Sequence, residues 1–325
     1  MRVAILGPGG VGGLVAGALA RANTPIVIVA SESTTAVISA QGIKVRSVLL
    51  GDFVAQPRAE ASLQEPVDVL VVATKAAGLA EALERIEVTP PFVLPLLNGL
   101  DHLAVLRRRF GEDPVVAGTI RVEADRPEPA VVVHTSKFLR VDMASHAPAM
   151  RDPMDRLAGI LSQAGVPARV YPPEPFDPSP ALRPVGLADG GEAQVMWSKL
   201  VRLNALACTT SAYDRLLGEI RSTPALRADL VASIEEGCAV ARAEGASIPA
   251  DDPLGELTAA HATLGSSMQR DIAAGRSPEL DAIPGSVLRA AARHGIACPA
   301  TERLVAMIAE RAGVALPVVA GPADG

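Results

Sequence analysis

The chain has 325 residues, 49% of them hydrophobic, which is the length of about two domains and enough apolar material for a packed core. A net charge of −6 and an aromatic content of 2% argue against a nucleic-acid partner, because such proteins need basic surfaces or stacking side chains. No basic stripe indicates a membrane partner, and no segment reaches the ~18 uninterrupted apolar residues of a spanning helix.

The cysteines and the N-terminal segment indicate in which cellular compartment the protein is expected. Cys208, Cys238 and Cys298 show neither metal-ligand spacing nor a disulfide framework, so we predict no metal site. Their apolar surroundings predict buried, reduced thiols in a cytoplasmic protein. The apolar N-terminus resembles a secretory signal, but glycines and a proline at 7–10 would break its helix.

The first half of the chain alternates between strand and helix patterns. Short apolar runs predict buried strands at 2–6, 26–30, 67–73, 92–96 and 114–117, and helices are expected at 11–21, 79–86 and 102–110. This alternation predicts an α/β fold, a Rossmann-type doubly wound parallel sheet. Two further β runs, 130–134 and 138–141, are expected to form an antiparallel edge.

The sequence pattern of the second half of the chain predicts helices only. Prolines and glycines at 172–193 predict a linker, so we expect a dinucleotide-binding domain at 1–190 and an all-helical substrate and catalytic domain at 191–325. Helices are expected at 193–211, 224–245, 255–274, 279–294 and 300–313, followed by a frayed tail at 315–325. Ser277 followed by Pro278 is typical of a helix start.

A glycine-rich loop follows the first strand. Gly7-Pro8-Gly9-Gly10-Val11-Gly12 matches the G-x-G-x-x-G pattern between a buried strand and a helix. In such a loop Gly7 permits a tight turn, Gly9 lets a pyrophosphate approach the backbone, and Gly12 allows close packing of helix and strand. This context favours dinucleotide binding over a plain turn.

The end of the second strand leaves the coenzyme open. Glu32 lies two residues beyond the strand, which is far for the acid that binds the ribose of NAD. The hydroxyls of Ser31, Ser33 and Thr34 could bond a 2′-phosphate, but no arginine is adjacent. From these residues alone NADP, NAD and a merely polar loop are all open.

Four later stretches carry a family resemblance. They are Ala73-Thr74-Lys75, Leu97-Asn98-Gly99, Trp197-Ser198-Lys199-Leu200, and Ser266-Ser267-Met268-Gln269-Arg270-Asp271 with Pro278-Glu279-Leu280-Asp281-Ala282-Ile283-Pro284-Gly285. In this order and spacing the chain resembles the ketopantoate reductases (2-dehydropantoate 2-reductases) from Met1 to about residue 312. The resemblance implies NADPH as the cofactor, with NADH as the alternative, and pantothenate biosynthesis as the pathway.

The resemblance also implies roles for single residues. Lys199 would be the general acid, Ser267 would bind the substrate carboxylate, and Glu279 would hold the substrate or orient Lys199. Lys75 and Asn98 would lie near the nicotinamide and the substrate.

The coenzyme site would then include Thr74, Lys75, Asn98 and Glu279 besides the glycine loop and Ser31. A lysine can stabilise the negative charge that hydride delivery builds on a ketone oxygen and then protonate it, provided that partial burial lowers its pKa.

Each of these residues also has a plain structural interpretation. Lys199 could be a surface lysine, and Lys75 a solvated strand end. Asn98 could belong to a simple turn, Ser267 could bond back to its own helix, and Glu279 could only match a helix dipole. Their joint occurrence favours the functional interpretation.

The chain departs from the family at three polar positions. Where the resemblance leads us to expect asparagines, it has Leu203, Ala207 and Leu217. Asn204 lies one position on, about 100° around the helix, and cannot simply replace the first of them. The polar contacts expected for the ketopantoate hydroxyl are therefore missing.

The sequence thus predicts an NADPH-dependent reductase of a small 2-oxo acid, either ketopantoate, which it would convert to pantoate, or a related and more apolar substrate. The rivals are an opine or hydroxyacid dehydrogenase-like oxidoreductase and a non-catalytic NADP-binding sensor. The sequence does not fix the oligomeric state, and a homodimer is compatible with it.

Overall fold

The computed structural model describes residues 1–171 and 191–319, which form two compact units. In this part of the chain the first unit holds Met1–Leu97, 102–171 and 191–195, and the second holds Asn98–Asp101 and 196–319. Most of the linker expected at 172–193 lies outside the described residues, but residues 191–193 are helical.

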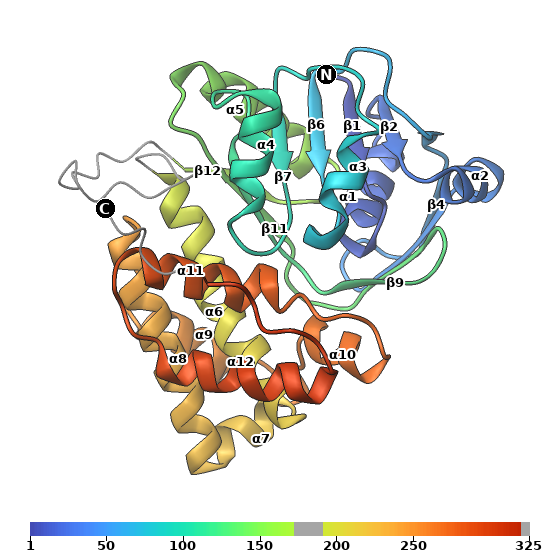
Figure 1. Cartoon of the computed structure of the whole chain (residues 1–325). Coiled ribbons are helices and arrows are strands. Elements are labelled where there is room, and N and C mark those ends of the chain that lie inside the picture. Colours follow the sequence, from blue (N-terminus) through green and yellow to red (C-terminus); the bar gives the residue numbers. More distant parts are fainter. Residues whose placement is uncertain (172–190, 320–325) are drawn as a thin grey trace. The chain divides into compact units, whose positions relative to one another are not determined.

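The first unit is built on a five-stranded parallel sheet. Its strands, in order across the sheet, are β5 (Arg58–Glu60), β2 (Ile26–Val29), β1 (Val3–Leu6), β6 (Val69–Val72) and β7 (Val93–Pro95). Figure 1 shows β2, β1, β6 and β7 side by side. All four residues of β1, β2 and β6 are buried, as expected when both faces of a parallel sheet are covered. The predicted α/β fold is confirmed.

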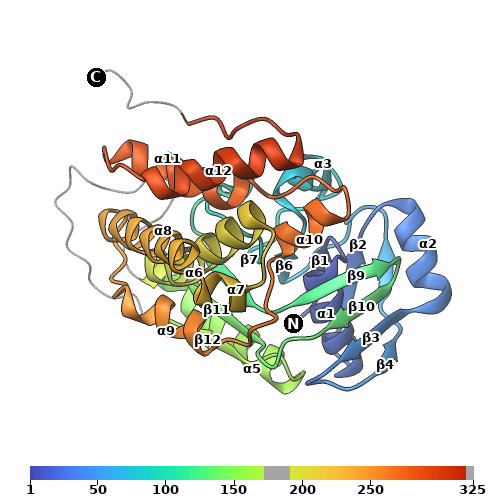
Figure 2. The ribbon, with the colours of Figure 1, turned by 90° about the horizontal axis from the view of Figure 1, so that it is seen from below.

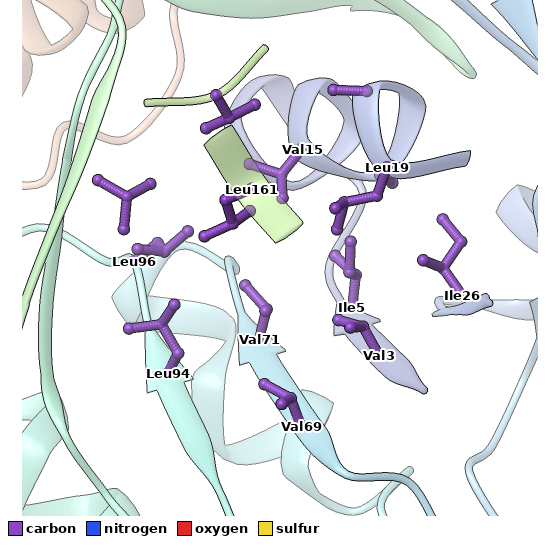
Figure 3. Close-up of a cluster of buried hydrophobic side chains, with 14 of the residues drawn as sticks. Val3, Ile5, Val15, Leu19, Ile26, Val69, Val71, Leu94, Leu96 and Leu161 are labelled. Atoms are coloured by element: carbon purple, nitrogen blue, oxygen red, sulfur yellow. The ribbon is translucent and has the colours of Figure 1, made fainter. Parts of the chain in front are cut away.

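Alternate residues of the sheet form one hydrophobic core with α1 (Gly10–Arg21) and α5 (Arg151–Gln163). Figure 3 shows Val3 and Ile5 of β1 on the face that meets Val15 and Leu19 of α1. Leu161 of α5 joins the same cluster. The strand period of two explains why every second residue faces this helix layer.

Two smaller sheets complete the first unit. One has the order β4 (Phe53–Ala55), β3 (Ile43–Ser47), β10 (Val131–His134) and β9 (Ala124–Glu128); the other has β12 (Ala168–Val170), β11 (Arg140–Ala144) and β8 (Ala117–Arg121). Helix α1 packs against the four-stranded sheet through its glycines. A Cβ at Gly13 would lie 2.6 Å from Val132 and one at Gly17 would lie 2.7 Å from Val45, so only glycine lets the helix come this close.

The sheets correct two predictions. The runs at 130–134 and 138–141 do not form one edge, because β10 and β11 belong to different sheets. The Ser136 hydroxyl bonds the Phe138 carbonyl (2.7 Å) in the bend that separates them. The strand expected at 114–117 is reduced to a bridge between Val115 and Val93, and β8 begins only at Ala117.

The remaining helical segments of the first unit are α2 (Glu32–Gln41), η1 (Ala76–Gly78), α3 (Leu79–Leu83), α4 (His102–Phe110) and η2 (Pro148–Met150). Helix α4 has the predicted bounds. Helix α2 occupies the segment that could have been a polar loop, and Ser31 is its N-cap, accepting a bond from the Thr34 backbone N–H (3.4 Å).

The second unit is helical, as predicted. It contains α6 (Gly191–Tyr213), whose first turn belongs to the first unit, α7 (Leu217–Ser222), α8 (Pro224–Ala243), α9 (Asp251–Ala259), α10 (Ser267–Ala273), η4 (Asp281–Gly285), α11 (Ser286–Arg293) and α12 (Pro299–Ala312). Helix α8 packs against α7, α11 and α12 (Figure 2). Among the described helices, none combines the length and apolar character needed to cross a membrane.

The single helix expected at 255–274 is wrong, since α9 and α10 are separate. The intervening carbonyls of Ala262 and Leu264 accept bonds from the backbone of Gly218 and Leu217 (both 2.8 Å). These tertiary bonds to α7 take the place of helical ones. Ser266 then caps α10 by accepting from the Gln269 N–H (3.0 Å).

The helix start predicted at Ser277 is also wrong. Helical structure begins at Asp281 with the π-turn η4, which passes into α11. Pro284 has no N–H to offer, and the next residue, Gly285, donates instead to the Leu280 carbonyl (3.1 Å). The wider turn thus accommodates a proline that a regular helix would not.

Candidate active site

The glycine loop forms the turn between β1 and α1. Gly7 has φ of +90°, and a Cβ there would lie 2.7 Å from Thr74 Cγ2. A Cβ at Gly12 would lie 2.2 Å from the Gly7 carbonyl oxygen. Side chains are therefore excluded at both positions by the tight turn and by close packing.

The middle of the loop is open. Gly9 is the N-cap of α1 without a side-chain cap, and apart from its neighbours along the chain no described residue has an atom within 4 Å of the place where its Cβ would be. A Cβ at Gly10, in contrast, would collide with the Ala124 carbonyl oxygen (2.3 Å). Pro8 is buried and Val11 is partly buried against the core. The first turn of α1 carries no acid, so its free N–H groups can receive an anion at Gly9.

Two neighbouring segments flank this loop in the first unit. Ser31, at the end of β2, has its hydroxyl beside those of Ser33 (3.2 Å) and Thr34 (3.1 Å). Thr74 follows β6, and its buried hydroxyl oxygen has no hydrogen-bond partner among the residues that the structure describes. Lys75 is exposed and directly precedes η1. All these groups lie at the carboxyl ends of parallel strands, where such sheets bind ligands.

The second unit brings three of the predicted site residues together. The Lys199 ammonium donates to Asn98 Oδ1 (2.9 Å), and Asn98 Nδ2 donates to Glu279 Oε2 (2.9 Å). Lys199 is only 9% exposed, while Asn98 and Glu279 are partly buried. The amide links a cation to an anion, and both bonds together define which way its oxygen and nitrogen point.

Local structure places each member of this triad. Lys199 lies in the middle of α6, two residues after the fully buried Trp197. Glu279 precedes η4, and its carbonyl accepts from the Ile283 N–H (3.0 Å). Its carboxylate accepts from the Asn98 amide, which the dipole interpretation alone did not predict.

Asn98 is held by the residue after it. Gly99 has φ of +83°, and a Cβ there would lie 1.9 Å from the Ala282 carbonyl oxygen in η4. The short Asn98–Asp101 segment thus packs directly on the π-turn within the second unit.

Ser267 occupies another part of the second unit. It is the exposed first residue of α10, and not a mid-helix serine. Its neighbour Ser266 accepts a bond from Thr210 on α6 (2.9 Å), so the start of α10 packs against the helix that carries Lys199.

Asn204 does not replace the missing asparagines. Its amide donates to Ser233 on α8 (3.3 Å) and accepts from Cys208 (3.5 Å), and it is fully buried. Leu203, one turn after Lys199, is partly buried. The predicted apolar character of this face of α6 therefore persists in the structure.

The three cysteines are free and buried, as predicted. Burial raises the pKa of Cys238 to about 11 and that of Cys298 to about 12, and it also raises the pKa of Cys208. Thiols in this state are poor nucleophiles.

Comparisons with known proteins agree with this architecture. Residues 3–147 match the family model described as ketopantoate reductase PanE/ApbA, and residues 193–312 match the model of its C-terminal part. The chain is 27% identical over 318 residues to the uncharacterized oxidoreductase YkpB of Bacillus subtilis (strain 168), covering 94% of this chain and 97% of the relative. It is 28% identical over 316 residues to the 2-dehydropantoate 2-reductase of Halobacterium salinarum, covering 95% and 98%.

A solved structure shares the fold. The ternary complex of D-mandelate dehydrogenase with NADH and anilino(oxo)acetate superposes with a TM-score of 0.83 at 18% identity, covering 96% of this chain and 99% of that one.

These matches define an oxidoreductase with a Rossmann-type unit and a helical unit. The chain belongs to the ketopantoate reductase family.

Sequence reasoning missed two polar residues beside the triad. Arg289 of α11 donates to Asp101 (2.6 Å), a residue of the segment that carries Asn98. Because 188 positions separate the two, no local motif could reveal the pair.

Proposed function

We propose that this chain is an NADPH-dependent reductase that reduces the ketone of a 2-oxo acid and that Lys199 donates the proton. The observation that carries the proposal is the Lys199–Asn98–Glu279 chain of hydrogen bonds. A buried ammonium held by an amide is suited to stabilise the negative charge that develops on a ketone oxygen and then to protonate it.

The described residues fit a dinucleotide. The open backbone at Gly9, the free N–H groups at the start of α1 and the unpartnered Thr74 hydroxyl can hold a pyrophosphate and the groups next to it. When bound, the reduced nicotinamide supplies the hydride. Ser31 and its neighbouring hydroxyls at the start of α2 support a 2′-phosphate, hence NADPH, and NADH is the alternative.

The chain's own residues divide the remaining work. Asn98 orients the Lys199 ammonium, and Glu279 holds the Asn98 amide so that its oxygen faces the lysine. Ser267 offers an exposed hydroxyl for the substrate carboxylate, and Lys75 adds a positive charge at the coenzyme side.

The substrate side chain is proposed to be more apolar than that of ketopantoate. Leu203 and Ala207 follow Lys199 at helical spacing, and the Asn204 amide is engaged with α8. A site that lacks a hydrogen-bond partner for the substrate hydroxyl gains no binding free energy from that hydroxyl and so does not select a hydroxylated substrate.

The test is oxidation of NADPH and of NADH with a panel of 2-oxo acids, including ketopantoate and 2-oxo-3-methylbutanoate. We expect a higher kcat/KM for the apolar acid and for NADPH. A kcat/KM for ketopantoate well above that for the other branched acids would refute the apolar assignment.

Substitution of the lysine tests the mechanism. Lys199→Ala should lower kcat on the order of 10²-fold or more while coenzyme affinity, measured by fluorescence titration, stays unchanged. Lys137→Ala, at an exposed lysine of the first unit, is the control and should retain full turnover. Turnover that requires an added amine would favour an opine dehydrogenase, and coenzyme binding without any turnover would favour a sensor.

A further inference from the structure

The strongest unassigned feature is a second bridge that runs beside the triad in the second unit. We propose that Arg289 is a positioning residue, which ties the segment carrying Asn98 to the segment carrying Glu279 and so holds Asn98 on Lys199. This inference rests on the proposed function of the triad.

The contacts of Arg289 span both segments. Its Nη2 donates to Asp101 Oδ2 (2.6 Å) and to the Asp281 carbonyl (2.8 Å), and its Nη1 donates to Asp281 Oδ1 (2.8 Å). Asp101 lies three residues after Asn98, and Asp281 lies two residues after Glu279. The guanidinium therefore connects the same two stretches of chain that the Asn98–Glu279 bond connects.

The Asn98–Asp101 segment needs such a tie. It contains only four residues, between Leu97 and the start of α4. Within the second unit it is held at Asn98 by the triad, at Gly99 by contact with Ala282, and at its far end by Arg289. A guanidinium is suited to hold the far end of the segment, because it is planar and rigid and can donate to two acceptors at once.

The two carboxylates are too exposed for this bridge to act mainly as a source of stability. The side chains of Asp101 and Asp281 are 49% and 73% exposed, and exposed ion pairs contribute little to folding. A displacement of about 1 Å at a catalytic group, in contrast, can cost about 10²-fold in rate. A purely structural and a positioning role therefore predict different results.

The chain offers a matched control on the same helix. Arg293, one turn after Arg289 on α11, pairs with the buried Glu244 (3.0 Å), a residue of the second unit outside the triad. Arg293→Gln removes an arginine–carboxylate pair from the same helix without touching the Asn98–Asp101 segment.

The experiment compares Arg289→Gln, Asp101→Asn, the double variant and Arg293→Gln in the full chain. We expect Arg289→Gln to lower kcat by about 10-fold to 10²-fold, with a much smaller change in KM and unchanged coenzyme affinity. Asp101→Asn should act in the same direction, and the double variant should be no slower than Arg289→Gln, because both remove the same bridge. Arg289→Lys keeps the positive charge and should therefore have a kcat between those of Arg289→Gln and the unsubstituted chain. Arg293→Gln should have an unchanged kcat, although its Tm should be lower.

A crystal structure of Arg289→Gln gives a readout besides activity. We expect Asn98 Oδ1 to move beyond hydrogen-bond distance from Lys199 Nζ. Equal kcat for Arg289→Gln and Arg293→Gln, or a retained 2.9 Å bond in the crystal, would overturn the positioning role. Absence of turnover by the unsubstituted chain would instead overturn the proposed function, and the crystallographic distance would then decide the positioning role alone.

Discussion

A buried ion pair anchors the helix that carries Lys199. Glu192, in the first turn of α6, is fully buried within the first unit. Its Oε2 accepts from the Arg107 guanidinium (2.7 Å), and its Oε1 accepts from the His146 backbone N–H (3.1 Å). Glu192→Gln preserves the shape of the side chain and removes its charge, so it tests what this pair contributes to stability.

The expected cost follows from the partner that remains. Only 2% of the Arg107 side chain is exposed, and breaking a buried pair from one side costs about 3–5 kcal/mol because it leaves a buried charge. Arg107 keeps weaker contacts with the Val115 carbonyl (3.3 Å) and Glu112 (3.5 Å), which favours the lower end, about 3 kcal/mol. At about 2–4 °C per kcal/mol, Tm should fall by about 6–12 °C.

The assay is thermal unfolding at neutral pH, followed by circular dichroism and calorimetry. Asp155→Asn is the control, since it breaks an exposed pair with Arg151 in which the side chains are 49% and 46% exposed. Such a pair is worth about 0.3–0.5 kcal/mol, so this variant should melt within about 2 °C of the unsubstituted chain. If Glu192→Gln lowered Tm no more than Asp155→Asn, the reasoning from burial would be refuted.

Two further predictions concern the glycine loop and pH. Gly9→Ala should weaken coenzyme binding in a titration, because its Cβ would enter the open space that the pyrophosphate is proposed to occupy, and it should leave Tm unchanged. Gly12→Ala should lower Tm, because its Cβ would meet the Gly7 carbonyl oxygen at 2.2 Å. Equal Tm values for the two variants would contradict this. The hydrogen bond with the Glu192 carboxylate raises the pKa of His146 above its usual 6.5. The stability that this bond contributes is complete below pH 6.5 and is lost as the pH rises through the raised pKa of His146. His146→Gln should therefore flatten the dependence of Tm on pH between pH 6.5 and that raised pKa. An unchanged slope of Tm against pH in this variant would count against the prediction.

The sequence by itself determined the fold class and the coenzyme loop. Strand and helix periods, and glycines between β1 and α1, are local patterns whose physical cause lies within a few residues. The bounds of α4 at His102–Phe110 were predicted for the same reason. Sequence reasoning also singled out Asn98, Lys199 and Glu279, through a resemblance and not through any local rule.

Only the tertiary structure decided how these residues meet. The bonds of Asn98 to Lys199 and to Glu279 span 101 and 181 positions, and no periodicity encodes such distances. Tertiary contacts also overrode local expectation where α7 takes the backbone carbonyls between α9 and α10. Arg289 shows the limit most clearly, because its proposed role depends on Asp101, a carboxylate 188 positions away that only packing brings within reach of its guanidinium.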